Sequence, residues 1–418
     1  MLLWNDLHPY HAVHVVRVMS PLDLPRLSEV IHRTLQKQGL GNVTLDARRG
    51  IFHYDGGAAK YEIKLIKVGD DPHADLAAEA ERQLNTRFAH NQSFCPFRFF
   101  VAAGHGSFFL GLVYFHAVAD GESVVNLVKS VVAGYLGHED PPDFELYPRL
   151  HDAILFRDPG LFLKKVLAIA GQLRTLRRAR RRTCQDPLEM RNGVTFISLK
   201  AEELQALVQT GKAWEVTLND LFLALLLQSF SRLRSEPPAP SRRSKLAVGC
   251  IVNLRKELGV ESRRTFGLFL GSFVVTCEPK PGAGLRELAR AVQQQTSRIK
   301  QKRLYVATAL ELHFARALLR FYSLERRKKF YQKNYPLWGG ITNMNLDSIW
   351  QPPAGTRPVD YLRAVSTGPA TPLVLSITTI GGGVNIGLTY RTACFSALEV
   401  AQVKSGFLDE VQRMRNPA

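Results

Sequence analysis

Residues 108–121 combine an apolar segment, a histidine and a tight turn, and this order constrains the fold more than any other feature of the chain. Phe108 to Phe115 is almost entirely aliphatic or aromatic, which is typical of a strand buried on both faces. Glu122 to Leu136 then carries apolar residues at the spacing of a helix. His116 therefore lies where a buried strand ends, and Asp120-Gly121 supplies residue types that favour a turn.

The position of His116 suits a general base. An imidazole at the end of a rigid strand can be held with its tip in a cavity, and its pKa lies near neutral pH. A histidine at a strand end can equally be a hydrogen-bonded polar residue, so these residues alone leave both interpretations open. A metal site is the weakest alternative, because Asp120-Gly121 interrupts any helix and no third ligand follows at a useful spacing.

The remaining sequence predicts a mixed α/β protein with two domains. A length of 418 residues accommodates two domains of about 200 residues each. We expect one domain over 1–185, carrying the histidine motif, and another over 186–418. Gly381-Gly382-Gly383 lies between two strand-like segments and predicts a hairpin turn. The main expected elements are strands at His11–Met19, within Val43–Lys67 and at Gly193–Leu199, and helices at Leu22–Gln38, Asp75–Arg87 and from Ala201 onward.

Five further segments follow the His116-x-x-x-Asp120-Gly121 motif in a characteristic order. They are VTLNDLFLA at 216–224, VGCIVNLR at 248–255, FGLFLGSF at 266–273, GITNMNL at 340–346, and the end from Leu388-Thr389-Tyr390 to Phe395-Ser396. Together they resemble the CoA-dependent acyltransferase superfamily, which includes chloramphenicol acetyltransferase, plant BAHD enzymes, polyketide-associated acyltransferases and peptide-synthetase condensation domains. Condensation domains usually carry HHxxxDG, whereas this chain has Phe115 before the histidine. The resemblance is therefore strongest to free-standing bacterial members, polyketide-associated or alcohol acyltransferases.

The resemblance implies a fold and an activity. The fold would be two chloramphenicol-acetyltransferase-like subdomains, each a mixed sheet flanked by helices, with a tunnel between them. The activity would be acyl transfer from a CoA or acyl carrier protein thioester to a hydroxyl or amine of a hydrophobic acceptor. The family forms no acyl-enzyme and needs no bound cofactor, and we expect no metal here.

The resemblance also assigns roles to particular residues. His116 would take a proton from the acceptor, and Asp120 would support the loop. Arg255, at the end of the VGCIVNLR segment, would pair with Asp120, and Gly121 would allow close backbone approach. Donors for the developing oxyanion would come from the GITNMNL segment, where Asn343 and Thr342 are the candidates, although Asn345 stands where the family usually has glycine.

The chain is strongly basic, with 55 Lys and Arg against 37 Asp and Glu and a net charge of +18. Arginines concentrate at 174–182, after an apolar helical stripe, so that 161–182 predicts a basic amphipathic helix. Such a helix could contact an anionic membrane, an acidic carrier protein or only solvent. No nucleic-acid motif accompanies the charge, so we expect no specific nucleic-acid binding.

Five scattered cysteines without a CxxC pair predict a reducing compartment and no disulfide or zinc framework. Nothing at the start resembles a signal peptide, and the longest apolar run, Leu221–Leu227, is too short to span a bilayer. We therefore expect a cytoplasmic protein with peripheral contact to the inner membrane face as an option. Two fused subdomains also favour a monomer.

A second functional class stays open at this stage. A condensation-like domain can bind a carrier protein or an anionic membrane surface through its basic face without catalysing a reaction. The intact His116-x-x-x-Asp120-Gly121 motif favours the enzyme, because a degenerate member has no reason to keep the base.

Overall fold

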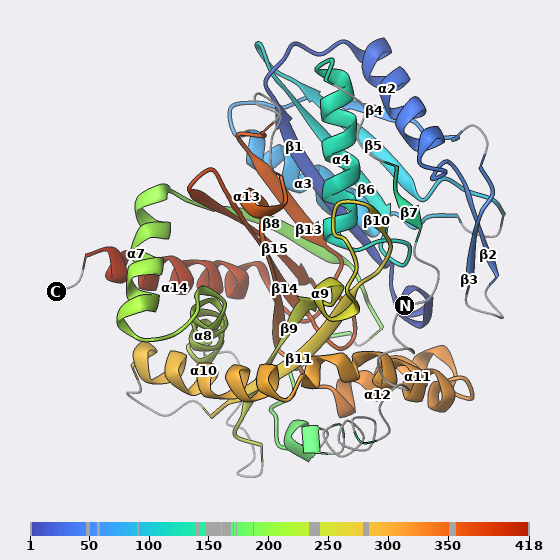
Figure 1. The fold of residues 1–418 in the computed structure, drawn as a ribbon. Coiled ribbons are helices and arrows are strands. Elements are labelled where there is room, and N and C mark those ends of the chain that lie inside the picture. Colours follow the sequence, from blue (N-terminus) through green and yellow to red (C-terminus); the bar gives the residue numbers. More distant parts are fainter. Residues whose placement is uncertain are drawn as a thin grey trace.

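Two sheets of similar build dominate the computed structural model (Figure 1). The structure describes residues 2–46, 51–56, 59–89, 92–138, 143–146, 160, 169, 171–172, 174–186, 188–233, 243–278, 284–350 and 357–416. Most of the apolar half of the expected basic helix, at 161–168, 170 and 173, lies outside these residues. The mixed α/β class and the two-subdomain architecture that the resemblance implies are confirmed.

The first sheet has five strands in the order β13-β1-β6-β5-β4. Its centre is β6, whose residues are all buried because every one of them is apolar or glycine. Helices α2 and α4 pack against each other, and α3 contacts β1. The elements are β1 (His11–Val18), β4 (Ile63–Ile66), β5 (Phe97–Ala103), β6 (Phe108–Phe115), β13 (Tyr361–Val365), α2 (Leu24–Lys37), α3 (Pro72–Asn85) and α4 (Gly121–Tyr135).

The second sheet has six strands in the order β11-β9-β12-β14-β15-β8. Helix α8 is almost entirely buried, and Thr217 begins it through a capping box with Asp220. Helices α7, α8, α10 and α14 pack on this sheet and on one another (Figure 1). The elements are β8 (Asn192–Leu199), β9 (Leu246–Asn253), β11 (Leu270–Cys277), β12 (Gly339–Asn345), β14 (Leu373–Ile380), β15 (Gly383–Arg391), α7 (Ala201–Ala213), α8 (Leu218–Ser231), α10 (Leu285–Gln301) and α14 (Ala397–Arg415).

Shorter elements complete the described part of the chain. Strands β2 and β3 form one small sheet, and β7 pairs with β10 in another. The bounds are α1 (Leu2–Leu7), β2 (Val43–Asp46), β3 (Ile51–Tyr54), β7 (Glu145–Leu146), α9 (Arg255–Leu258), β10 (Thr265–Phe266), η1 (Leu304–Ala307), α11 (Thr308–Leu319), α12 (Leu324–Asn334) and α13 (Leu346–Ile349).

The C-terminal half of the chain contributes a strand to the first sheet. Strand β13 belongs to the C-terminal half of the chain but pairs antiparallel with β1 in the first sheet. Its backbone approaches β15 so closely that a Cβ on Gly387 would lie 1.8 Å from the carbonyl oxygen of Arg363. Only glycine fits at position 387, and this contact brings the end of the first sheet against the second.

The expected hairpin at the three consecutive glycines is confirmed. Strands β14 and β15 pair antiparallel up to Ile380 and Gly383. Gly381 and Gly382 have φ values of 58° and 84°, which a two-residue hairpin turn of the primed type requires and which glycine adopts without strain.

No helix in the described ranges is long and apolar enough to cross a bilayer.

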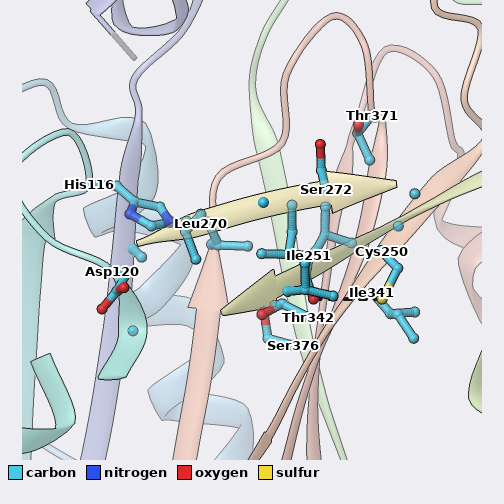
Figure 2. A pocket seen from close by; sticks show the side chains of 18 of the residues that line it. His116, Asp120, Cys250, Ile251, Leu270, Ser272, Ile341, Thr342, Thr371 and Ser376 are labelled. Carbon is cyan, nitrogen blue, oxygen red and sulfur yellow. Dashed lines mark hydrogen bonds between the residues drawn. The ribbon is translucent and has the colours of Figure 1, made fainter. Parts of the chain in front are cut away.

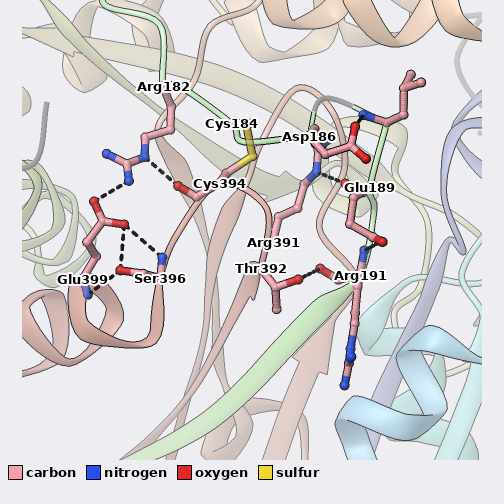
Figure 3. Close-up of a disulfide and its surroundings, with 11 residues drawn as sticks. Arg182, Cys184, Asp186, Glu189, Arg191, Arg391, Thr392, Cys394, Ser396 and Glu399 are labelled. Atoms are coloured by element: carbon pink, nitrogen blue, oxygen red, sulfur yellow. Dashed lines mark hydrogen bonds and ion pairs between the residues drawn. A yellow bond between two sulfur atoms is a disulfide. The ribbon is translucent and has the colours of Figure 1, made fainter. Parts of the chain in front are cut away.

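The expectation that the chain has no disulfide is wrong. Cys184 and Cys394 are bonded, with an S–S distance of 2.00 Å, although 210 residues separate them in the sequence. The segment before β8 runs alongside the segment after β15, and Gln185 N–H donates to the Ala393 carbonyl at 2.8 Å (Figure 3). Cysteine spacing cannot reveal a pair that only this tertiary contact brings together, and the pair removes the basis for expecting a reducing compartment.

Removing this disulfide is expected to lower the free energy of unfolding by about 2–5 kcal/mol. The double substitution Cys184→Ala with Cys394→Ala tests this in urea unfolding, with substitution of Cys277, a cysteine outside the disulfide, by alanine as the matched control. Peptide mapping without reductant should find the two peptides linked. Unlinked peptides from protein purified under oxidising conditions would contradict the bond.

Candidate active site

A cavity of about 620 Å³ lies between the two sheets. The first sheet contributes His14, Tyr114 and His116, and the second contributes residues of β9, β11, β12 and β14. Figure 2 shows the His116 ring projecting toward Leu270 of β11, while the Asp120 carboxylate lies below the ring in this view, with its oxygens pointing away from Leu270. The cavity therefore occupies the place where the sequence analysis expected a tunnel.

The carbonyl of Ala119 determines which ring nitrogen of His116 can accept a proton. His116 Nδ1 lies 2.8 Å from the Ala119 carbonyl oxygen, and because a carbonyl only accepts, Nδ1 must carry the hydrogen. In the neutral ring Nε2 then keeps its lone pair. The turn that follows β6 thus selects the tautomer that can accept a proton at Nε2.

Aromatic side chains hold the His116 ring in place. Tyr10 stacks on it with ring centroids 4.8 Å apart, and Tyr114 contacts it edge-on at 5.3 Å. Burial lowers the pKa of His116 below its ordinary value of 6.5, and the nearby Arg363 charge lowers it further, against opposing effects of the Ala119 carbonyl and Asp120. His116 is therefore neutral at pH 7 and ready to act as a base.

Asp120 and Arg255, which the resemblance pairs, form a buried two-pronged ion pair. Arg255 Nη1 and Nη2 lie 2.7 and 3.0 Å from the two Asp120 oxygens, and the side chains are only 4% and 2% exposed. Asp120 also caps α4 by accepting from Ser123 N–H at 2.9 Å, and it accepts from Phe269 N–H at 3.0 Å. These contacts occupy both oxygens of the Asp120 carboxylate and join α4 to the second half of the chain. Asp120 therefore positions the His116 turn and does not exchange protons with substrate.

Gly121 is required by space and not by backbone conformation. A Cβ at this position would lie 3.0 Å from Met344 Cε and 3.3 Å from Arg363 Nη1. A side chain would therefore displace groups that line the cavity. This agrees with the close backbone approach that the resemblance implies.

The two oxyanion candidates both line the cavity. Thr342 is partly buried in β12, and its carbonyl oxygen accepts from Arg363 Nη2 at 3.4 Å. Asn343 is exposed. Figure 2 shows Thr342 beside Ser376 on the second sheet, on the opposite wall from His116. A donor role for either residue remains a proposal.

Sequence reasoning missed two charged or titratable residues near His116. His14 donates to or accepts from Tyr361 Oη through Nδ1 at 2.7 Å, and burial holds its pKa well below 6.5. Arg363 of β13 lies opposite His14 in the sheet register. The signal in the sequence is a single arginine within the otherwise apolar strand Tyr361–Val365.

Farther from His116 the cavity contains one more acid. Glu311 of α11 lines it, and burial raises the pKa of Glu311 to about 7. No cluster of three or more His, Cys, Asp or Glu residues in the described ranges has the arrangement of a metal site. The site therefore offers proton transfer by His116, polar backbone and cationic groups for a developing charge, and an apolar cavity.

Comparisons with known proteins now identify the fold. No family model matches the sequence, and no curated protein matches it. Solved structures do match. The fold is that of condensation domains.

The matching structures include two peptide-synthetase proteins and one polyketide-synthase-associated protein. The EpoB NRPS cyclization-docking bidomain from Sorangium cellulosum has a TM-score of 0.71 at 14% identity, covering 98% of this chain and 81% of its own. The first condensation domain of the calcium-dependent antibiotic synthetase, in complex with a substrate analogue, has a TM-score of 0.70 at 15% identity, covering 100% and 95%. Polyketide synthase associated protein 5 from Mycobacterium tuberculosis has a TM-score of 0.68 at 14% identity, covering 100% and 97%. The condensation-domain fold thus extends over the whole chain.

The state of His116 predicts a pH profile for any reaction in which it is the base. The base must be neutral, so kcat/KM should fall as pH drops through the pKa of His116, which lies below 6.5. We expect a flat profile from pH 7 to 8 and a midpoint below 6.5, measured with buffers of constant ionic strength. A rising limb centred above pH 7 would contradict the tautomer and burial described here.

The stability of the folded protein sets the lowest pH at which this profile can be measured. Burial lowers the pKa of His8 to about 3 and that of His11 to about 2, so both are neutral in the folded protein and protonated in the unfolded chain below pH 6.5. Their contribution to stability is present above pH 6.5 and is lost as pH falls. Circular dichroism at each pH separates this loss from the titration of His116.

Proposed function

We propose that this protein is an acyltransferase that moves an acyl group from a thioester to a hydroxyl or amine of a hydrophobic acceptor. The observation that carries the proposal is the free Nε2 of a neutral, buried His116 facing a cavity between two condensation-type sheets. General-base catalysis needs this combination of a fixed imidazole, a suitable pKa and access to substrate.

The reaction needs one proton acceptor and no covalent enzyme intermediate. His116 Nε2 takes the proton of the acceptor O–H or N–H while that oxygen or nitrogen attacks the thioester carbonyl carbon. The new C–O or C–N bond forms, the carbonyl oxygen becomes negative, and donors in the cavity stabilise it. The carbonyl then re-forms as the C–S bond breaks, and the leaving thiolate takes the proton from His116, which releases a thiol and returns the imidazole to its neutral form.

The basic charge of the chain supports an acyl donor whose thiol carrier is negatively charged. Both coenzyme A and an acyl carrier protein present a thioester on a phosphate-containing arm. Arg263 lines the cavity, and burial together with the Arg263 charge lowers the pKa of Lys129. A basic side chain at the cavity with a second one near it suits an anionic donor, and the net charge of +18 acts in the same direction.

Thiol release from a panel of acyl-CoA thioesters tests the proposal, with a panel of hydrophobic alcohols and amines as acceptors. Mass spectrometry should detect an ester or amide product, and the preferred acyl length reports on the cavity. Acyl carrier protein thioesters form the second donor panel, because they share the chemistry and differ only in the carrier.

The alternative of a non-catalytic domain predicts a different result. Such a domain would bind an acidic carrier protein or anionic vesicles and release no thiol from any thioester. Complete absence of turnover with both donor panels, together with binding, would overturn the acyltransferase proposal.

A further inference from the structure

Arg363 differs from the other strongly buried arginines of this protein. Arg363 is only 5% exposed. Its guanidinium nevertheless keeps its positive charge at neutral pH. Among the described residues no Asp or Glu forms an ion pair with it. Two arginines with buried side chains form ion pairs, Arg255 with Asp120 at 2.7 Å and Arg182 with Glu399 at 2.5 Å. A third buried arginine, Arg391, lies close enough to Asp186 and Glu189 that their charges raise its pKa against the lowering effect of burial.

The hydrogen-bond acceptors that the described residues offer to the Arg363 guanidinium are all neutral. Nε donates to Thr378 Oγ1 at 2.8 Å, and Nη2 donates to the Ile377 carbonyl at 2.6 Å and the Thr342 carbonyl at 3.4 Å. These contacts join β13 to the second sheet and fix the plane of the group. Nη1 forms no hydrogen bond within the described part of the chain, and its two N–H groups stay available.

The available nitrogen lies at the start of α4, inside the cavity. Nη1 is 3.3 Å from the position that a Cβ of Gly121 would occupy, and both residues line the cavity with His14 and His116. Helix α4 is 15 residues long, and its first amides carry the positive end of the helix dipole. Asp120 uses its oxygens on Arg255, Ser123 and Phe269, so it does not neutralise this corner.

The neighbouring acid is also engaged elsewhere. The Glu122 carboxylate accepts from the Asn253 side-chain amide. Burial lowers the pKa of Arg363 to about 10, and the groups that oppose this effect are Tyr114 and Tyr361 rather than an acid. Buried charges in proteins are paired, because an unpaired charge away from water is costly. A ligand that brings a negative charge would supply the missing partner.

We propose that Arg363 and the start of α4 bind a carboxylate of the acceptor, so that the preferred acceptor is a hydroxy or amino acid with an apolar body rather than a neutral alcohol or amine. Arginine binds planar carboxylates through charge-assisted hydrogen bonds. The bound carboxylate would place the hydroxyl or amine near His116 Nε2, and apolar residues such as Leu270, Phe273 and Ile341 would cover the rest of the molecule. The identity of this substrate class rests on the proposed acyltransferase function, whereas the anion site does not.

Binding tests the anion site without any turnover. We would titrate the full-length protein at pH 7.5 with 3-hydroxydecanoate and with its methyl ester by isothermal titration calorimetry. The acid should bind at least about tenfold more tightly, because its charge replaces a missing partner. Arg363→Gln should remove this preference and Arg363→Lys should keep part of it, whereas Arg391→Gln, an equally buried arginine outside the cavity, should leave the preference unchanged.

Turnover with the same pair then tests the substrate class. With the acyl-CoA that supports the fastest thiol release, kcat/KM for the acid should exceed that for the ester at least about tenfold, mainly through KM. A KM difference lost in Arg363→Gln supports carboxylate binding. Equal loss of kcat for both acceptors would instead make Arg363 a group that stabilises the oxyanion and would overturn the proposal.

The two proposals fail in different ways. Equal binding of acid and ester by the wild-type protein overturns the carboxylate site even if acyl transfer is observed. Arg363-dependent binding of the acid without thiol release from either donor panel overturns the acyltransferase function and leaves the anion site standing. Decyl phosphate forms a third arm, and a preference for it over the acid would overturn the carboxylate in favour of a phosphate ester.

Discussion

His116→Ala is expected to lower kcat for acyl transfer by a factor of about 10²–10⁴, which is the usual contribution of a positioned general base. The loss should be this large because the Ala119 carbonyl holds the hydrogen of His116 on Nδ1, which leaves Nε2 of this cavity-lining residue to accept the proton. The measurement is product formation under saturating donor and acceptor, with the wild-type protein beside it.

Two controls separate loss of the base from loss of the fold. His116 contributes stacking with Tyr10, so the alanine variant must show an unchanged circular dichroism spectrum and a similar thermal midpoint. His73→Ala removes a histidine that pairs with Asp360 outside the cavity at 2.7 Å and should retain turnover. Full activity in folded His116→Ala would remove His116 from the mechanism.

Arg255→Met is expected to lower the free energy of unfolding by about 3–5 kcal/mol, because it leaves the Asp120 carboxylate buried without its counter-charge. The pair is only 4% and 2% exposed, so water cannot compensate the charge as it would at the surface. Urea unfolding followed by circular dichroism measures this loss. Activity should fall as well, since Asp120 positions the turn that carries His116.

A double-substitution cycle tests whether this loss belongs to the pair. Asp120→Asn combined with Arg255→Met removes both charges, so the double variant should be less destabilised than the sum of the single variants. Arg290→Met is a matched control, because its ion pair with Glu215 is exposed on both sides and such pairs contribute about 0–1 kcal/mol. Simple additivity in the cycle would show that the two side chains act independently.

Local sequence patterns predicted much of the secondary structure around the site. The apolar run at 108–115 is strand β6, and the helical spacing that follows is α4. The expected strand at 11–19 and the expected helix at 22–38 are β1 and α2 within two residues at each end. These elements were predictable because burial on one or both faces leaves a periodic pattern in adjacent residues.

Contacts between distant segments were less accessible. The sequence predicted no disulfide, whereas Cys184 and Cys394 are bonded. Cysteine spacing does not show that the segments flanking β8 and β15 run side by side. Arg363 was missed for the same reason. Its role in the proposed anion site depends on its having no carboxylate in contact, and the sequence does not show which side chains are in contact. The pairing of β13 with β1, across the two halves of the chain, could not be predicted from the sequence either.

The order of the motifs was enough to predict the fold class, the turn that carries His116, and the pairing of Asp120 with Arg255, because each depends on local periodicity or on a recurring arrangement of segments. The tautomer of His116 is set within its own turn, by the Ala119 carbonyl. The cavity between the sheets and the uncompensated charge of Arg363 depend on tertiary structure. A charge is unpaired only with respect to everything packed around it, so these two properties exist only once segments hundreds of residues apart have come together.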